Sequence, residues 1–165
     1  MRIYLVGYMG CGKSTLGKQL ALRLGYDFVD LDRYIETKNE CSITSIFKKY
    51  GETVFRKEER LCLEEVSNKI SIVISVGGGT PCFSDNMELM NHTGKTLFLN
   101  PPISLLFKRL KNRTEHRPLL ANKTDKELLE FIERNYNERL PCYQKAQHTI
   151  ISENIKVDDL LPFFN

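Results

Sequence analysis

The chain has 165 residues, a length typical of one domain. Hydrophobic residues make up 41% and charged residues 27%, which is close to the globular average and argues against a largely disordered chain. The net charge of +3 does not by itself indicate binding to nucleic acid or to a membrane, and no apolar run approaches the roughly 20 residues of a membrane span. We therefore expect one cytoplasmic domain over residues 1–165, acting as a monomer without nucleic-acid or membrane partners.

Five short apolar segments alternate with helical patterns along the chain. The strand candidates are apolar and often β-branched, and the helices carry leucines at helical spacing, capping residues or terminal glycines. Thr124 and Glu127, for example, form the capping-box pattern that begins a helix. In chain order, we predict a strand at 3–6, a helix containing 16–24, a strand at 28–32, helices over 43–50 and 52–66, strands at 70–76 and 96–99, a helix over 101–110, a helix from 124, a strand at 149–151 and a short final helix.

This alternation predicts an α/β fold. Strands that alternate with helices imply right-handed crossovers, and hence a five-stranded parallel sheet with helices on both faces. Ligands of such sheets bind at the carboxyl ends of the strands. Three predicted strand ends carry unusual residues, namely the glycine-rich stretch from Gly7, the pair Asp30 and Asp32, and the glycines at 77–79. We expect these three segments to face one cleft.

The five cysteines form an odd set with no C-x-x-C pair and no tight spacing. Such a set predicts neither a disulfide framework nor a zinc site, so we expect reduced thiols. The three histidines are isolated from one another and suggest no metal triad or nucleophile–base pair. The cysteines are Cys11, Cys41, Cys62, Cys82 and Cys142.

Residues 7–14 match the phosphate-loop pattern G-x-x-x-x-G-K-[ST] at every fixed position, between a predicted strand and a predicted helix. Glycines let several backbone N–H groups point at an anion, and the helix N-terminus adds partial positive charge. Lys13 is placed to reach the β- and γ-phosphates, and the Ser14 hydroxyl can bind Mg²⁺. The predicted nucleotide-binding residues are Gly10, Cys11, Gly12, Lys13, Ser14 and Thr15. Two function classes then compete, a kinase and a non-catalytic ATP-binding module, and only the kinase requires a second polar cleft.

Asp30 and Asp32 supply the first candidates for that cleft. At the end of a strand, their spacing of two would send both side chains to one face. One carboxylate can orient an acceptor hydroxyl or take its proton, and the other can hold the water shell of Mg²⁺. Alternatively, Asp32 is the N-cap of a helix through Tyr34, and Asp30 is a solvated strand end.

The middle of the chain supplies further candidates, each with a structural alternative. Arg56 offers a planar fork that fits a carboxylate, or is an exposed helix arginine paired with Glu59. Phe47 and Phe55 either wall a small pocket or belong to the core. The glycines at 77–79 either let a substrate approach the backbone closely or form a flexible turn.

Basic residues crowd a segment with little apolar periodicity after the predicted helix over 101–110. We interpret this segment as a mobile loop over the phosphates, because arginines there can stabilise the charge on a transferring phosphoryl group. Arg139 is either a second carboxylate ligand or a surface charge. The crowded basic residues are Arg109, Lys111, Arg113 and Arg117.

Six motifs, in this order and spacing, resemble the shikimate kinase family across nearly the whole chain. They are G-x-x-G-x-G-K-S-T at 7–15, D-x-D at 30–32, G-E-x-x-F-R-x-x-E at 51–59, G-G-G at 77–79, R-x-x-x-R-P-L-L at 113–120 and R-x-x-x-Y at 139–143. The resemblance implies a P-loop kinase architecture of the nucleoside-monophosphate-kinase type, with a mobile lid at about 112–123 and an acceptor-binding region at about 32–61. The implied reaction transfers the γ-phosphate of ATP to the 3-hydroxyl of shikimate, on the route to chorismate and the aromatic amino acids.

The resemblance also implies a role for each matching residue. On the acceptor side, Asp32 holds the reacting hydroxyl, and Arg56 and Arg139 hold the shikimate carboxylate. The implied acceptor-binding residues are Asp32, Arg56, Gly77, Gly78, Gly79 and Arg139, and Glu59 would anchor Arg56. Phe47 and Phe55 join them as the pocket wall considered above. On the phosphate side, Lys13 and Arg117 reach the phosphates, Ser14 and Asp30 organise Mg²⁺ (Asp30 through water), and Arg113 packs on the adenine.

The chain departs from the family near its last predicted strand. The family's adenine loop there often carries a basic residue and a proline, whereas residues 152–155 carry neither, so the base is left to backbone groups. Gluconate kinase shares the P-loop and the architecture and also phosphorylates a hydroxy acid, so it is the alternative enzyme. The glycines at 77–79 together with the pair Arg56 and Glu59 favour shikimate.

Overall fold

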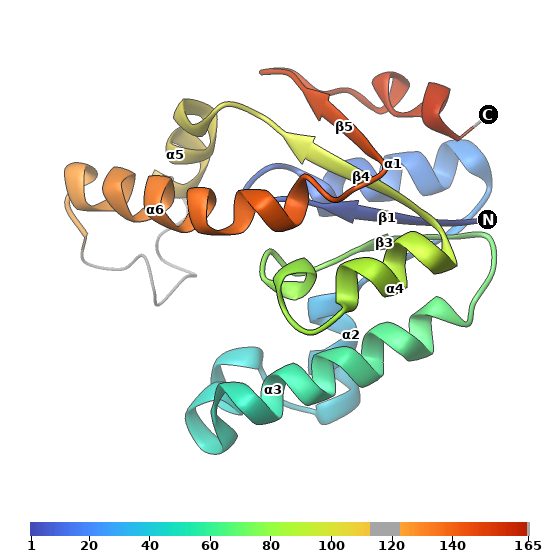
Figure 1. The fold of residues 1–165 in the computed structure, drawn as a ribbon, viewed down its shortest axis with the longest axis horizontal. Coiled ribbons are helices and arrows are strands. Elements are labelled where there is room, and N and C mark those ends of the chain that lie inside the picture. Colours follow the sequence, from blue (N-terminus) through green and yellow to red (C-terminus); the bar gives the residue numbers. More distant parts are fainter. Residues whose placement is uncertain (113–122, 165) are drawn as a thin grey trace.

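The computed structural model describes residues 1–112 and 123–164, and its centre is a parallel β-sheet (Figure 1). The strand order in this sheet is β2-β3-β1-β4-β5, and every neighbouring pair is parallel. The predicted parallel sheet of five strands is therefore confirmed. The strands are β1 (Arg2–Val6), β2 (Asp27–Asp30), β3 (Ile72–Ser75), β4 (Lys95–Asn100) and β5 (His148–Ile151).

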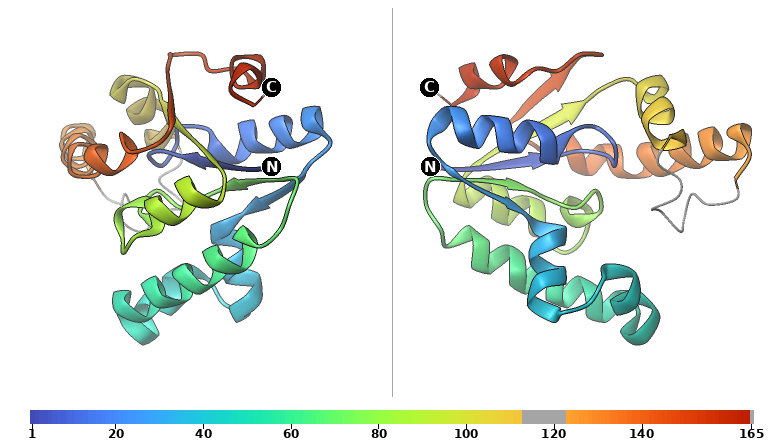
Figure 2. Two further views of the ribbon diagram at one scale, coloured as in Figure 1. Left: turned by 45° about the vertical axis from the view of Figure 1, so that its right-hand side comes forward. Right: turned by 180° about the vertical axis from the view of Figure 1, so that it is seen from behind.

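Helices cover both faces of the sheet, as the alternating pattern predicts (Figures 1 and 2). In both figures α1 lies on one face near the C-terminal turns, and α4 lies on the other face beside α3. The arrows of β1 and β4 point toward the end of the molecule that carries α5, so the carboxyl ends of the strands lie there. The helices are α1 (Lys13–Leu24), α2 (Leu31–Asn39), α3 (Ile43–Ser67), α4 (Asn86–Thr93), α5 (Ile103–Lys111) and α6 (Asp125–Tyr143), with 3-10 turns at Thr80–Cys82, Val157–Asp159 and Leu161–Phe163.

The three inner strands form the core. Residues 3–6 of β1, residues 72–74 of β3 and residues 97–99 of β4 are all 0% exposed, as expected for strands covered on both faces. Tyr4 is equally buried, and its hydroxyl is hydrogen-bonded to the hydroxyls of Ser67 and Thr93, each at 2.8 Å. This pairing satisfies the one polar group that Tyr4 brings into the core.

The loop between β1 and α1 provides no side-chain cap for the first turn of the helix. α1 begins at Lys13, and Gly12 before it has φ 106° and makes no side-chain cap bond to the helix. A left-handed residue of this kind favours glycine, and the uncapped N–H groups remain available to an anion. At the other end, Gly25 has φ 67° and closes α1 where the sequence predicts its end.

Two predicted strand boundaries are wrong, namely the end of β2 and the start of β3. β2 ends at Asp30, whose carboxylate accepts a hydrogen bond from the backbone N–H of Arg33 and so caps α2. Asp32 is therefore in the first turn of α2 and is neither a strand residue nor the N-cap. The predicted strand at 70–76 begins only at Ile72, because Ser71 has φ 54° and Ile70 is 73% exposed.

Among the helices, two further predictions are confirmed and two others are wrong. The predicted break between helices over 43–50 and 52–66 is confirmed, because Gly51 has φ 80° and ψ 171°, and α3 consists of two helices joined at this kink. No element is predicted from the sequence at 86–93, where the structure has α4. The predicted short final helix is a pair of 3-10 turns. The predicted capping box of Thr124 and Glu127 is confirmed at the start of α6.

The five cysteines all lie within the described part of the chain, and each is a free thiol. Among residues 1–112 and 123–164, no helix is long and apolar enough to cross a membrane.

Candidate active site

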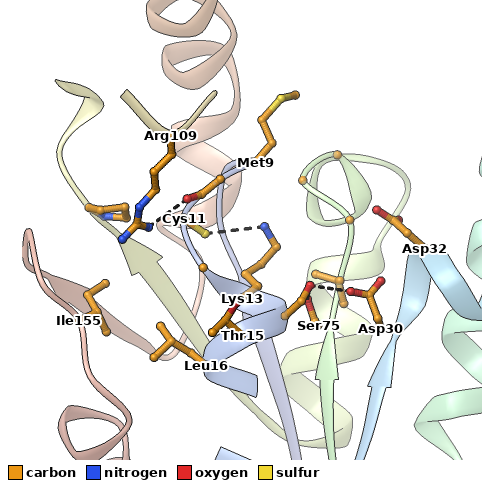
Figure 3. A pocket seen from close by; sticks show the side chains of 18 of the residues that line it. Met9, Cys11, Lys13, Thr15, Leu16, Asp30, Asp32, Ser75, Arg109 and Ile155 are labelled. Atoms are coloured by element: carbon orange, nitrogen blue, oxygen red, sulfur yellow. Dashed lines mark hydrogen bonds between the residues drawn. The ribbon is translucent and has the colours of Figure 1, made fainter. Parts of the chain in front are cut away.

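A cavity of about 870 Å³ at the carboxyl ends of the strands joins the two halves of the predicted site (Figure 3). In Figure 3, Arg109 and Ile155 lie on one side of Lys13, and Asp30 and Asp32 lie on the other. The structure therefore brings together segments that are far apart in the sequence. The predicted site residues that line the cavity are Gly10, Cys11, Gly12, Lys13, Ser14, Thr15, Asp30, Asp32, Phe47, Phe55, Arg56, Glu59, Gly77, Gly78, Gly79 and Arg139.

Lys13 is the centre of the phosphate half. Its ammonium donates hydrogen bonds to the carbonyl oxygens of Gly7 (2.8 Å) and Tyr8 (3.0 Å), and lies 3.7 Å from Cys11 Sγ. The residue is only 8% exposed. The loop thus holds the ammonium of Lys13 inside its own curve, beside the backbone donors of residues 10–15.

Ser14, Asp30 and Ser75 form an oxygen-rich corner beside Lys13. The Ser14 hydroxyl donates to Asp30 Oδ2 at 2.5 Å and lies 3.3 Å from the Ser75 hydroxyl. Hydroxyl and carboxylate oxygens are hard ligands of the kind that Mg²⁺ prefers, often through retained waters. These residues fit a magnesium ion, and β2 and β3 place them next to the phosphate loop.

Asp32 faces the cavity from the first turn of α2. Its Oδ1 packs so closely on Gly77 that a Cβ at this glycine would lie 2.7 Å away. Burial, and next the neighbouring Asp30 carboxylate, raise the pKa of Asp32 to about 6. A carboxylate with a pKa near neutrality is suited to proton exchange with a substrate.

Arg56 and Glu59 lie one turn apart on α3, at the acceptor end of the cavity. Arg56 Nη1 donates to Glu59 Oε2 at 2.7 Å, and the Glu59 side chain is only 1% exposed. The hydroxyl of Thr80 donates to the other carboxylate oxygen of Glu59 at 2.6 Å. The rings of Phe47 and Phe55, 4.5 Å apart, form an apolar wall beside Arg56.

Arg139 reaches the same cavity from α6. Its guanidinium lies 5.8 Å from the Tyr8 ring, and a Cβ at Gly78 would approach its Nη1 to 3.4 Å. The hydroxyl of Tyr143, one turn further along, donates to the Gly78 carbonyl at 2.5 Å. The two fixed residues of the R-x-x-x-Y motif therefore both lie close to Gly78, and Arg139 also lines the cavity.

Arg109 and Ile155 line the far end of the phosphate half. Arg109 lies on α5, and its Nη1 donates to the Gly10 carbonyl at 3.0 Å. From the sequence, Arg109 is predicted only as part of a basic segment and the adenine contact is predicted for Arg113, since no short motif marks a residue that reaches the phosphate loop from a distant helix. Arg113, Arg117 and most of the predicted lid lie outside the described residues.

A phosphate loop that opens into the same cavity as a buried carboxylate and two arginines defines a P-loop kinase for a small acidic acceptor. Comparisons with known proteins identify the family. The family model for shikimate kinase matches residues 9–161. A shikimate kinase of Phocaeicola vulgatus is 46% identical over 155 residues, which cover 94% of this chain and 89% of the relative.

Solved structures agree. The crystal structure of shikimate kinase from Bacteroides thetaiotaomicron aligns with a TM-score of 0.93 at 43% identity, covering 98% of this chain and 94% of that one. Shikimate kinase from Acinetobacter baumannii in complex with shikimate aligns with a TM-score of 0.84 at 35% identity, covering 98% and 88%. The chain belongs to the shikimate kinase family.

Family membership decides between the function classes that the sequence leaves open. The protein is an ATP-dependent kinase, so the non-catalytic ATP-binding module is set aside. The shikimate kinase interpretation also holds over the gluconate kinase alternative.

Proposed function

We propose that this protein transfers the γ-phosphoryl group of ATP to the 3-hydroxyl of shikimate, in the biosynthesis of chorismate and the aromatic amino acids. The observation that carries the proposal is the single cavity that joins the Lys13 loop to Asp32, Arg56 and Arg139. The relative from Acinetobacter baumannii, whose structure is described as a complex with shikimate, supports the choice of acceptor.

The acceptor half matches the chemistry of a small hydroxy acid. Arg56 and Arg139 would bind the carboxylate, since guanidinium groups form charge-assisted bonds to both carboxylate oxygens. Asp32 would orient the 3-hydroxyl and accept its proton as the phosphoryl group is transferred. The glycines at 77–79 allow the acceptor to lie directly against the backbone, and Glu59 holds Arg56 in place.

The phosphate half would stabilise the transferring group. Lys13 and the backbone N–H groups of residues 10–15 would bind the β- and γ-phosphates. Ser14 and Asp30 would hold Mg²⁺, Asp30 through water, and the bound ion would neutralise charge on the phosphate oxygens. Roles for Arg117 at the phosphates and Arg113 at the adenine follow from the family resemblance alone.

The nucleotide base would lie at the end of the cavity formed by Arg109 and Ile155. A guanidinium and an aliphatic side chain offer two surfaces for a planar base. Residues 152, 153, 155 and 156 also line the cavity, and their backbone groups would read the base.

Several expectations from the sequence stay predictions. They are a single domain over 1–165, a lid at about 112–123, a monomeric state, a cytoplasmic location, and the absence of nucleic-acid or membrane partners.

A coupled assay of ADP release tests the proposal. The full chain, with ATP and Mg²⁺, is given shikimate or gluconate in parallel reactions, beside a blank without acceptor. We expect ADP release with shikimate well above the blank and little with gluconate. ADP release with gluconate but not with shikimate would contradict the assignment.

A further inference from the structure

The guanidinium of Arg56 has carboxylate partners along its edges and an aromatic ring over one face. Along its edges, Nη1 donates to Glu59, and Nε and Nη2 donate to Glu52 Oε1 at 3.3 and 3.2 Å. Over its face, Cζ of Arg56 lies only 3.6 Å from the centre of the Phe83 ring. The ring of Phe55 is more distant, at 5.0 Å. Of these two rings, that of Phe83 is in the closer contact with the guanidinium.

The edge contacts alone do not fix the direction of the fork. Glu52 is 56% exposed, so its two bonds to Arg56 compete with water and with any carboxylate ligand. An arginine has five N–H donors, and the contacts to Glu52 and Glu59 engage three of them within the described residues. The other two, one on each terminal nitrogen, remain for an acceptor carboxylate. They serve a bidentate contact only if the guanidinium plane stays in one orientation.

A flat ring in contact with the guanidinium face restricts that plane. Stacking on an aromatic ring is favourable for arginine and resists tilting, because tilting separates the two faces. The side chain of Arg56 is only 17% exposed, so the stacked face is largely shielded from water. Phe83 therefore acts where the carboxylates cannot, on the tilt of the guanidinium.

Phe83 itself is held by the segment that follows the glycines. It directly follows the 3-10 turn at Thr80–Cys82, and its N–H donates to the Thr80 carbonyl. The Asn86 side chain donates to the same carbonyl at 2.9 Å, and the Thr80 hydroxyl binds Glu59. One short segment therefore sets both the face partner and, through Glu59, an edge partner of Arg56.

Phe83 does not line the cavity formed by the described residues, whereas Arg56 and Phe55 do. Any effect of Phe83 on the acceptor must then pass through its neighbours. We propose that Phe83 is a positioning residue that fixes the guanidinium plane of Arg56 for the acceptor carboxylate, and so sets the affinity for shikimate. The proposal rests on the proposed function and adds to it a residue that none of the six sequence motifs contains.

The test measures steady-state kinetics of Phe83→Leu and Phe83→Met in the full chain. Both side chains keep apolar volume but lose the ring. We expect the KM for shikimate to rise about 3- to 30-fold, from the usual range of guanidinium–aromatic interactions, with the KM for ATP and kcat changed by less than about twofold. Phe83→Tyr keeps the ring face and should keep the KM for shikimate near the wild-type value.

Phe163→Leu is the matched control. Phe163 is also half-buried and in contact with a ring, that of His148, whose centre lies 5.0 Å away, but it lies beside β5, at an edge of the sheet. The substitution Phe163→Leu should leave the KM for shikimate and the KM for ATP unchanged. Thermal unfolding of every variant shows which ones fold, and the methionine variant serves if the leucine variant does not.

A double variant decides whether the effect passes through Arg56. Added to Arg56→Lys, Phe83→Leu should raise the KM for shikimate little further, because the stacked guanidinium is already gone. Fully additive effects, a wild-type KM in the folded ring-less variants, or equal rises for shikimate and ATP would overturn the proposal. If the wild type neither turns over nor binds shikimate, as measured by calorimetry, the proposed function fails and this inference falls with it.

Discussion

The two halves of the cavity are built in different ways. The phosphate half comes mainly from one continuous stretch, residues 7–15, and the phosphate ligands proposed for it are backbone N–H groups and one lysine that the same stretch holds in place. The acceptor half takes side chains from α2, α3 and α6, and backbone from the glycine segment after β3. None of these four elements forms the acceptor half by itself.

This difference separates two kinds of effect. A change in the phosphate half should impair transfer to any acceptor, because the charge that develops during transfer is stabilised there. A change in the acceptor half should act first on recognition of the acid, and it can act from a distance, because each side chain depends on partners in other elements. The following predictions test this division.

Lys13→Ala should have the largest effect. Loss of a preorganised cation at the phosphates typically lowers kcat by about 10²- to 10³-fold. Steady-state turnover at saturating ATP and shikimate measures this. Lys18→Ala is the matched control, since Lys18 lies on the same helix and is exposed. Near-normal turnover of a folded Lys13→Ala protein would contradict the expectation that the phosphate half controls transfer.

Arg56→Lys should raise the KM for shikimate about tenfold to a hundredfold and change the KM for ATP little. Lysine keeps the charge but loses the fork, and a lost charge-assisted hydrogen bond is worth roughly 1.5–3 kcal/mol. Arg60→Lys, one turn further along α3, is the control, because Arg60 bonds Glu64, Asp85 and Asn86. Equal weakening for both substrates would assign Arg56 a structural role instead.

Low pH should lower kcat/KM for shikimate, because it protonates Asp32 in the acceptor half. Its pKa is raised to about 6, so the side chain is protonated below that pH and can no longer accept a proton from the acceptor. We expect kcat/KM for shikimate to fall about tenfold per pH unit below about pH 6 and to be level above it. The residual activity of Asp32→Asn should lack this limb, whereas Asp27→Asn, at an exposed position in β2, should retain it. A profile that is level down to pH 5 would contradict the role of Asp32.

Gly79→Ala should have the smallest effect, a rise of about 3- to 10-fold in the KM for shikimate, comparable to a modest loss of one charged contact. Gly79 has φ −92°, so alanine brings no backbone strain. The new Cβ would lie 2.9 Å from Arg56 Nη2, and a flexible side chain can move away. Thermal unfolding should therefore change little, which separates a misplaced fork from a damaged fold. An unchanged KM would show that the acceptor half tolerates a displaced Arg56.

The sequence predicts well whatever depends on neighbouring residues. The phosphate loop is contiguous, so its function can be inferred from spacing alone, and the capping box of α6 is equally local. The inner strands are predicted because burial on both faces demands apolar residues at every position. Even Gly51 is anticipated as an interruption, since few residues other than glycine adopt its φ of 80°.

The sequence predicts less where the outcome depends on contacts between distant segments. Asp30 and Asp32 are both good capping residues, and only the length of β2 decides that Asp30 caps the helix. The helix α4 gives a weak signal, because it is short and Asp85 before it makes no side-chain cap bond. Arg109 reaches the phosphate loop, and Phe83 reaches Arg56, from segments that contain none of the six motifs, so only the folded chain shows their contacts.

The continuity of the cavity from Ile155 to Arg139 also bears on inhibition. A single compound could join an adenosine-like group to a hydroxy acid through a linker that passes Lys13. Such a compound loses its freedom of motion only once, so the second contact forms at a high effective concentration. Linking two weak binders in this way can strengthen binding by about 10²- to 10⁴-fold when the linker has the right length. The open passage between the two halves is thus an opportunity for tethered, bisubstrate ligands.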